Sequence, residues 1–228
     1  MISYIFLGTS NHPKATITLK RLTQDGYFRP SNCIVITNSI DGSFPKLSSD
    51  LGYQVKVVNS DYDTLQVLKN IDFDFLICCG WHLKISKKVL KLPKIAAINS
   101  HSSYLPDYKG LGAYKHAWAN VEKYAGNTIH LMDENFDTGI ILAQKKVRIY
   151  FWDTPKTLLK RISRETPNLI QLGINRCQQK GTKCSQRNNK NGRYFFKTSK
   201  SQFIRHRLYN LIAKTLGLEL KLTKYKVK

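Results

Sequence analysis

The feature that most constrains the fold is a regular alternation of short β-branched or aromatic runs with helix-like segments. The strand-like runs are residues 2–7, 33–37, 53–58, 73–79 and 96–99. The segments between them, residues 13–22, 44–51, 62–69 and 86–90, are typical of helices or short helical turns. Such an alternation predicts an α/β fold, a Rossmann-like, mostly parallel sheet with helices on both faces. The wholly apolar stretch Phe75-Leu76-Ile77-Cys78-Cys79 favours a central strand that is covered on both sides.

The pattern changes after residue 99, where a loop rich in Ser, Pro, Tyr and Gly begins. A helix is expected near residues 113–121, followed by strand-like runs at 127–132 and 139–149 that would extend the sheet as antiparallel or mixed strands. Pro155 opens a further helix to about residue 174, with Asp153 or Thr154 as its cap.

The last part of the chain differs in composition, and we divide the sequence into a domain of residues 1–176 and a short basic C-terminal extension of residues 177–228. Residues 178–191 are typical of a linker, and a strand is expected near residues 193–197. A helix should follow, because apolar residues recur there at helical spacing while basic residues occupy the rest of the circumference. The apolar residues are Ile204, Leu208, Leu211, Ile212 and Leu216, and the basic ones are Arg205, Arg207 and Lys214.

Positive charge is concentrated in that extension. The chain has 37 Lys and Arg against 15 Asp and Glu, a net charge of +22. The extension has 14 of these basic residues and one acidic residue, Glu219. Such a segment attracts nucleic acid, an anionic membrane surface or phosphorylated small molecules, or it acts only as a solubilising tail. We expect it to assist substrate or surface binding without taking part in the chemistry.

The cysteines and the hydropathy of the chain indicate a cytoplasmic protein. Five cysteines show no paired pattern, and Cys78 and Cys79 lie in an apolar run where thiols behave as small hydrophobic groups. Cys177 and Cys184 lack the short spacing and histidine partners of a zinc site, so no metal is expected. No apolar run approaches the ~20 residues that span a bilayer, so no transmembrane segment is expected, and the chain start is typical of a strand rather than a signal peptide.

Candidate catalytic groups occur at the end of the strand predicted at residues 96–99. Asn99 and His101 are two residues apart and can project from the same face at the carboxyl end of that strand, where open α/β sheets place ligands. Asp137 lies on a later loop before a Thr-Gly turn, and a carboxylate there could orient His101 or keep it basic. Asn99 would supply an amide donor to an oxyanion. A lone histidine at a strand end is, however, more often a hydrogen-bonded structural residue.

The loop after the first strand is a second candidate site. Gly8, Thr9 and Ser10 precede a predicted helix and could bind a phosphate through backbone N–H groups. A turn with a single glycine is also simply a turn, and the sequence contains neither a Walker motif nor a complete Gly-x-Gly-x-x-Gly loop.

Taken together, several motifs resemble the formyltransferase family that uses 10-formyltetrahydrofolate. The motifs are Asn99-x-His101, Ser103-x-Leu105-Pro106 with Gly110, Gly126-Asn127-Thr128-Ile129-His130, and Met132-Asp133-Glu134-x-x-Asp137-Thr138-Gly139. The family includes glycinamide ribonucleotide, methionyl-tRNA and sugar-nucleotide formyltransferases. The likeness is strongest over about residues 70–170 and extends more weakly to the N-terminal sheet.

The resemblance implies an enzyme in which Asn99, His101 and Asp137 transfer a formyl group from the folate to an amine. Asn99 and protonated His101 would stabilise the oxyanion, while Asp137 would orient His101 and assist removal of the amine proton. The pterin ring would lie between two loops. One loop would offer backbone groups of Leu83, Lys84 and Ile85, and the other would form the opposite wall with Asp133, Glu134, Asn135 and Phe136.

Two positions depart from the family pattern. Ser102 stands where proline is usual, and Asn135 replaces a common glycine, although asparagine tolerates left-handed backbone angles. Neither change removes a member of the Asn-His-Asp set. A catalytically inactive relative that serves as a binding protein is the alternative.

The resemblance leaves the amine acceptor open. We favour a nucleotide-linked amino sugar, with glycinamide ribonucleotide as the second candidate, and in either case a phosphorylated small-molecule amine. Methionyl-tRNA ranks third, because residues 177–228 are too few for the second domain of those enzymes. A nucleic-acid or membrane-binding protein without catalysis belongs to a different class, and a homodimer is a further partner that the sequence allows.

Overall fold

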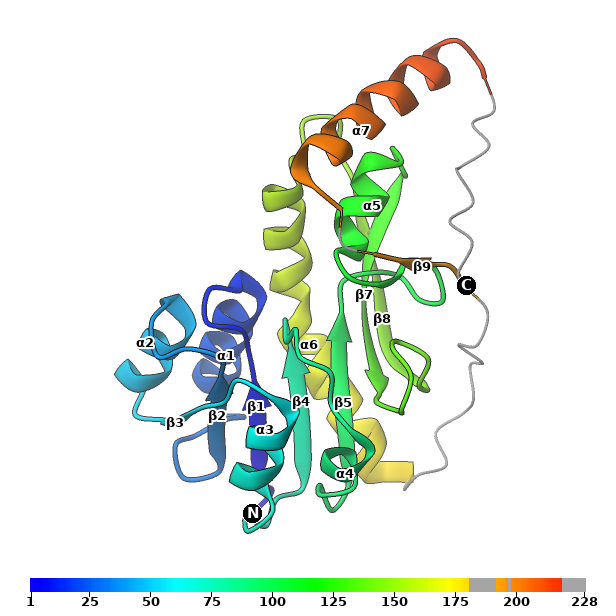
Figure 1. Ribbon diagram of the computed structural model, residues 1–228. Coiled ribbons are helices and arrows are strands. Elements are labelled where there is room, and N and C mark those ends of the chain that lie inside the picture. Colours follow the sequence, from blue (N-terminus) through cyan, green and yellow to red (C-terminus); the bar gives the residue numbers. More distant parts are fainter. Residues whose placement is uncertain (181–191, 197, 219–228) are drawn as a thin grey trace.

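The computed structural model describes residues 1–180, 192–196 and 198–218 (Figure 1). Its centre is a seven-stranded sheet in the order β3-β2-β1-β4-β5-β7-β8. The five strands β1 to β5 run parallel, and β7 and β8 are antiparallel. The strands are β1 (Tyr4–Leu7), β2 (Cys33–Thr37), β3 (Gln54–Val57), β4 (Phe75–Cys79), β5 (Ala96–His101), β7 (Tyr124–Leu131) and β8 (Ile141–Arg148). The predicted mostly parallel α/β sheet with an antiparallel extension is confirmed.

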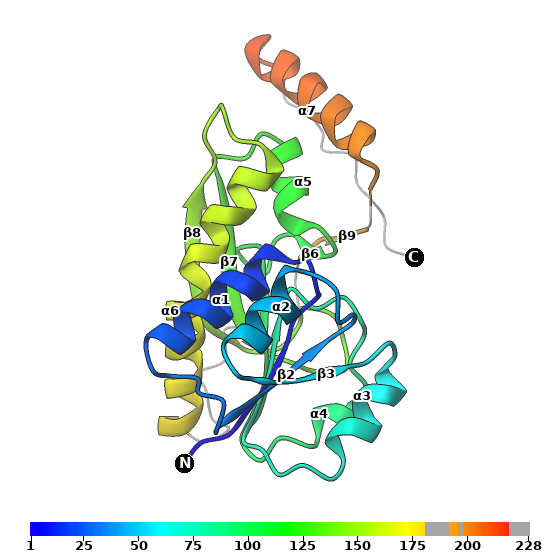
Figure 2. The ribbon, with the colours of Figure 1, turned by 90° about the vertical axis from the view of Figure 1, so that its left-hand side faces the viewer.

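Helices cover both faces of the sheet, as Figure 2 shows with α1 and α6 on one side and α3 and α4 on the other. Alternation along β1 explains the two layers: Tyr4 and Phe6 pack into one hydrophobic cluster with α1 and α6, while Ile5 and Leu7 pack into a second. The helices are α1 (Pro13–Gln24), α2 (Ser43–Asp50), α3 (Asp61–Leu68), α4 (Lys87–Leu90), α5 (Ala113–Ala119), α6 (Pro155–Lys180) and α7 (Lys200–Thr215).

Two elements are longer than the sequence predicted. β5 continues through Ser100 to His101, so the candidate histidine belongs to the strand itself. α6 passes Pro167 and reaches Lys180, across the domain boundary that was placed at residue 176. The predicted linker from residue 178 therefore begins as helix, and its residues 181–191 lie outside the described part of the chain.

The described part of the C-terminal extension packs on the domain. The strand β9 (Tyr194–Phe195) pairs in parallel with β6 (Lys109–Gly110), and α7 contacts α5. Arg207 of α7 donates hydrogen bonds to the Trp118 and Phe151 carbonyls, and its guanidinium lies 4.3 Å from the Trp118 ring centroid. A buried charge of the extension is thus satisfied by the domain.

The orientation of α7 differs from what its apolar spacing suggests. The side chains that α7 buries are Phe203, Arg207, Asn210 and Ala213. The predicted apolar stripe is largely exposed, with exposed fractions of 46% for Ile204, 57% for Leu208, 60% for Ile212 and 66% for Leu216. Within the described ranges, no helix is both long and apolar enough to cross a membrane.

The close approach of α1 to β1 generates a stability prediction. A Cβ at Gly8 would lie 2.5 Å from Ala15 Cβ and 2.8 Å from the ring of Phe44, both fully buried. We expect Gly8→Ala to lower the free energy of unfolding by about 1–3 kcal/mol, because neither neighbour can withdraw. Chemical denaturation measures this, and Ser49→Ala on the exposed side of α2 should change stability by less than about 0.5 kcal/mol. Equal stabilities of the two variants would contradict the prediction.

Candidate active site

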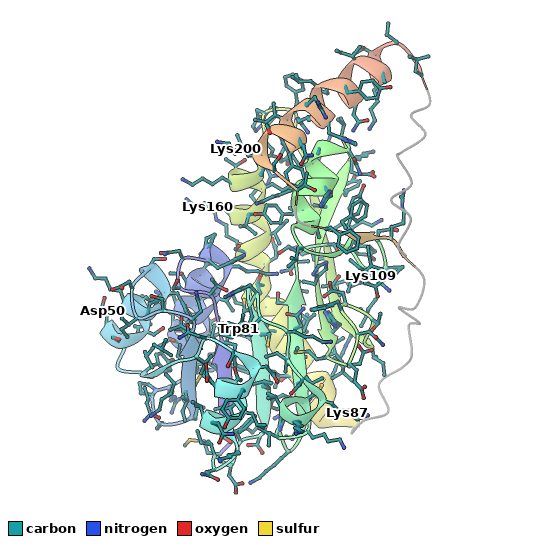
Figure 3. The ribbon with its side chains drawn as sticks, in the orientation of Figure 1. Asp50, Trp81, Lys87, Lys109, Lys160 and Lys200 are labelled. Carbon is teal, nitrogen blue, oxygen red and sulfur yellow. The ribbon has the colours of Figure 1, made fainter. Side chains whose placement is uncertain are left out.

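The three candidate catalytic residues lie together beyond the carboxyl end of the parallel strands. Asn99 and His101 lie at the carboxyl end of β5, and Asp137 lies in the loop between β7 and β8. Asn99 Nδ2 donates to Asp137 Oδ1 at 3.3 Å, and His101 Nδ1 is 3.3 Å from the same oxygen. The carboxyl ends of β4 and β5 meet at this edge, where Figure 3 labels Trp81 in the loop after β4. The structure therefore forms one cluster from residues 38 positions apart.

Asp137 is the centre of this cluster. Its carboxylate is buried, accepts from the Gly110 N–H at 2.8 Å through Oδ2, and lies 3.4 Å from His130 Nε2 through Oδ1. Burial on its own raises the pKa of Asp137, but His101, His130 and the Gly110 N–H outweigh it and hold the pKa below its ordinary value. The group is consequently an ionised carboxylate at neutral pH.

His101 is held from both sides of its ring. Nε2 donates to the Tyr108 carbonyl at 2.8 Å, since a carbonyl can only accept. Burial lowers the pKa of His101, although Asp137 and the Tyr108 carbonyl pull in the opposite direction. A neutral imidazole with its proton on Nε2 leaves Nδ1 as an acceptor facing the Asp137 carboxylate. His101 Nδ1 and Asp137 Oδ1 are therefore two facing acceptors, and together they can accept one proton.

The sequence analysis did not assign a role to His130. This residue of β7 pairs in register with Asn99 of β5. Its Nδ1 donates to the Leu131 carbonyl at 2.8 Å, which leaves Nε2 to accept from Asn99 Nδ2 at 3.2 Å. The Asn99 amide therefore directs its N–H groups toward His130 and Asp137, and donation to an oxyanion requires release of one of these long bonds. The motif that ends at His130 marked this residue in the sequence, but only the antiparallel pairing of β7 with β5 places it beside Asn99.

Lys14 is a second residue that the sequence analysis missed. It is fully buried in α1, and its ammonium donates to the Ser100 carbonyl at 3.0 Å, Ser102 Oγ at 3.1 Å and Asn127 Oδ1 at 3.0 Å. Burial lowers the pKa of Lys14 to about 8. Because Ser100 lies between Asn99 and His101, this lysine fixes the end of the catalytic strand.

The residues expected to bind the folate line a small cavity beside the cluster. The cavity has a volume of about 80 Å³ and reaches Asn99, His130 and Asp137. All seven predicted cofactor residues line it, namely Leu83, Lys84, Ile85, Asp133, Glu134, Asn135 and Phe136. Its two loops touch where Lys84 Nζ lies 5.9 Å from the Phe136 ring centroid and where Lys87 pairs with Glu134. Exposed ion pairs of this kind contribute little, so a bound ring can separate the loops at small cost.

Unpaired polar groups line this cavity. No described residue accepts a hydrogen bond from the buried Trp81 Nε1. Likewise, no described group bonds to the backbone N–H or C=O groups of Leu83, Lys84 or Ile85. A buried polar atom is nearly always satisfied in proteins, so the Trp81 Nε1 fits a polar partner such as a pterin.

The loop of Gly8, Thr9 and Ser10 lies beside the loop after β4. Its backbone N–H groups donate to the Ile36 carbonyl at 3.0 Å, the Gly80 carbonyl at 3.4 Å and Asn38 Oδ1 at 2.9 Å, respectively. Thr9 Oγ1 is 3.0 Å from His82 Nδ1. These three N–H groups are engaged within the protein, so a phosphate at this loop would have to be bound by other groups. Among the described residues, no three His, Cys, Asp or Glu side chains lie together as a metal ion would need.

Comparison with known proteins identifies the family. A family model described as "Formyl transferase" matches residues 29–173, more than half of the chain. The chain therefore belongs to the formyl transferase family.

Its curated relatives include methionyl-tRNA formyltransferases. That of Clostridium novyi (strain NT) is 40% identical over 97 residues, which are 42% of this chain and 31% of the relative. That of Methylacidiphilum infernorum (isolate V4) is 36% identical over 118 residues, 52% of this chain and 37% of the relative. The match thus spans about a third of the length of these relatives.

Solved structures share the fold. A phosphoribosylglycinamide formyltransferase from Bacillus halodurans has a TM-score of 0.68 at 23% identity, covering 78% of this chain and 96% of that chain. An N-formyltransferase from Helicobacter canadensis, in complex with folinic acid and dTDP-3-aminofucose, has a TM-score of 0.68 at 21% identity, covering 96% and 83%.

The contact between His101 Nδ1 and Asp137 Oδ1 generates a titration prediction. Asp137→Asn removes the strongest influence that raises the pKa of His101, so we expect that pKa to fall further below its ordinary value. An NMR titration of the His101 imidazole measures the change. Asp72→Asn is the matched control, because the Asp72 side chain is 91% exposed. An unchanged or raised pKa in Asp137→Asn would show that the carboxylate does not act on His101.

The C-terminal extension is joined to the cluster through β6. Gly110, whose N–H binds Asp137, pairs with Phe195 of β9, and the Leu111 N–H donates to the Phe195 carbonyl at 3.1 Å. The Phe195 ring stacks on Tyr108 with centroids 4.7 Å apart, and the Tyr108 carbonyl accepts from His101. The described part of the extension therefore supports backbone groups that orient both His101 and Asp137.

A kinetic prediction follows for Phe195→Ala. Loss of the stacked ring should loosen the backbone at Tyr108 and Gly110 and lower kcat at saturating substrates by about tenfold, since misplaced catalytic groups lose rate strongly. Steady-state kinetics measures this, with near-UV circular dichroism to verify folding. Phe151→Ala, which truncates a ring that is 80% exposed, should leave kcat unchanged. A normal kcat in folded Phe195→Ala would mean that β9 has no influence on the cluster.

Proposed function

We propose that this protein transfers a formyl group from 10-formyltetrahydrofolate to the primary amine of a nucleotide-linked amino sugar. The observation that carries the proposal is the buried set of Asn99, His101 and Asp137 beside a cavity with unpaired polar groups. Family membership and the folinic acid in the Helicobacter canadensis relative support the folate as formyl donor.

The residues would divide the chemistry as follows. When bound, 10-formyltetrahydrofolate supplies the electrophilic formyl carbon. Asp137 and His101 Nδ1 would take the proton that the attacking amine must lose. His101, once protonated, and Asn99 would then stabilise the negative charge that develops on the formyl oxygen. The proton held by the pair is afterwards available to the departing nitrogen of the folate, which restores the ionised carboxylate and neutral imidazole.

Leu83, Lys84 and Ile85 would bind the pterin through their backbone groups, and residues 133–136 would form the opposite wall. The acidic and basic side chains at the cavity edge, Glu134 and Lys84, would remain toward solvent. Gly8, Thr9 and Ser10 remain candidates for substrate contact, although their backbone N–H groups and the Thr9 hydroxyl already have partners within the protein.

The amino sugar is favoured over glycinamide ribonucleotide because the structural match to the sugar enzyme covers more of this chain. The fold match to the Helicobacter canadensis enzyme covers 96% of this chain, whereas the match to the Bacillus halodurans enzyme covers 78%. The equal TM-scores keep glycinamide ribonucleotide as the second candidate.

An acceptor panel tests this function. The protein is incubated with 10-formyltetrahydrofolate and nucleotide-linked amino sugars, glycinamide ribonucleotide or methionyl-tRNA, and tetrahydrofolate release and a formyl mass gain are followed. We expect turnover with an amino sugar. His101→Ala and Asp137→Ala should each lose about 10²–10⁴ in rate, as expected for an acid–base group, while exposed Asp72→Ala remains active. Turnover with only another acceptor would reassign the substrate, and active triad variants would refute the assigned site.

A further inference from the structure

A second cavity lies outside the cluster around Asp137, between α5, β9 and α7, and Figure 1 shows α5 and α7 in the upper part of the molecule. Its volume is about 580 Å³, within the range of about 300–1,000 Å³ that small-molecule sites occupy. The cavity beside Asp137 has about 80 Å³ by comparison. Most lining residues of the large cavity belong to the C-terminal extension, so this segment forms most of a cavity that is large enough for a small-molecule ligand.

The lining combines positive charge with aromatic surface. Arg193, Arg205 and His206 supply cationic or titratable groups, and Tyr194, Phe196 and Tyr209 supply rings. Of the described residues that line the cavity, none is acidic. Guanidinium groups bind phosphates in a bidentate manner, and aromatic faces stack on heterocycles. A ligand with both a flat base and phosphate groups matches this lining, whereas inorganic phosphate would leave the rings unused.

The cavity is adjacent to the catalytic site. Tyr194 lines the large cavity, and its hydroxyl donates to the Phe136 carbonyl at 3.1 Å. Phe136 in turn lines the small cavity that contains Asp137. A residue that lines the large cavity is thus hydrogen-bonded to a residue of the loop that carries Asp137.

We propose that this cavity binds the nucleoside diphosphate part of the acceptor, with the base against Phe196 and Tyr209 and the phosphates at Arg193 and Arg205. The assignment rests on the proposed function, because the amino sugar attached to that nucleotide must reach Asn99 and His101. It gives the basic extension a specific role: recognition of the acceptor rather than a general attraction to anions.

Binding of a nucleoside diphosphate alone tests the assignment. UDP and dTDP are titrated by calorimetry into the full-length protein without folate, with inorganic pyrophosphate and a short single-stranded RNA in parallel. Arg205→Ala and Phe196→Ala should each weaken nucleotide binding by about tenfold, the effect of losing a charge-assisted hydrogen bond or a stacked ring. Arg164→Ala on α6 and Phe151→Ala are matched controls, because both side chains are exposed outside the cavity.

The outcomes separate this inference from the proposed function. Nucleotide binding that is weakened in the two cavity variants and normal in the controls supports the inference, even if no amino sugar is formylated. Equal affinity for pyrophosphate, tighter binding of the RNA, or no nucleotide binding would overturn it. If an amino sugar is formylated with an unchanged Michaelis constant in Arg205→Ala and Phe196→Ala, the function stands and the cavity assignment fails.

Discussion

Burial of the Asp137 carboxylate is the interaction on which the site depends. A charge removed from water is costly unless neighbouring groups compensate it, and here those groups come from separate segments. The Asn99 amide on β5 and the Gly110 N–H on β6 donate hydrogen bonds to the carboxylate, and the His101 ring on β5 and the His130 ring on β7 lie against it. Asp137 also has a φ of 55°, a left-handed conformation that aspartate tolerates better than most residues. One carboxylate therefore requires three strands to converge, and their convergence forms the candidate active site.

Lys14 imposes the corresponding constraint from the opposite side of β5. Its three oxygen partners belong to β5, the loop that follows it and β7, so α1 is anchored to the same strand end that supplies Asn99 and His101. Two buried charges of opposite sign thus hold the strand that carries Asn99 and His101. Because each charge has several hydrogen-bond partners, the end of this strand is kept rigid.

The C-terminal extension has two physical roles that composition does not distinguish. Arg207 is buried and acts as a hydrogen-bond donor to the domain, whereas Arg193 and Arg205 line an open cavity. Both kinds of arginine contribute equally to the net charge. β9 then joins this segment to the backbone of Lys109 and Gly110, so the proposed ligand cavity and the orientation of Asp137 share one structural support.

The sequence by itself determined the alternating elements, the apolar central strand β4, and the places of Asn99 and His101 at a strand end and of Asp137 on a later loop. Periodicity and spacing determine these features because they depend only on neighbours along the chain. Only the tertiary structure decided that His130 faces Asn99, that Lys14 reaches Ser100, and that α7 buries Arg207 rather than Leu208. These contacts join residues far apart in sequence. These contacts form because particular elements lie side by side and because every buried charge needs hydrogen-bond partners. The local pattern of one segment reveals neither the neighbouring element nor the partner.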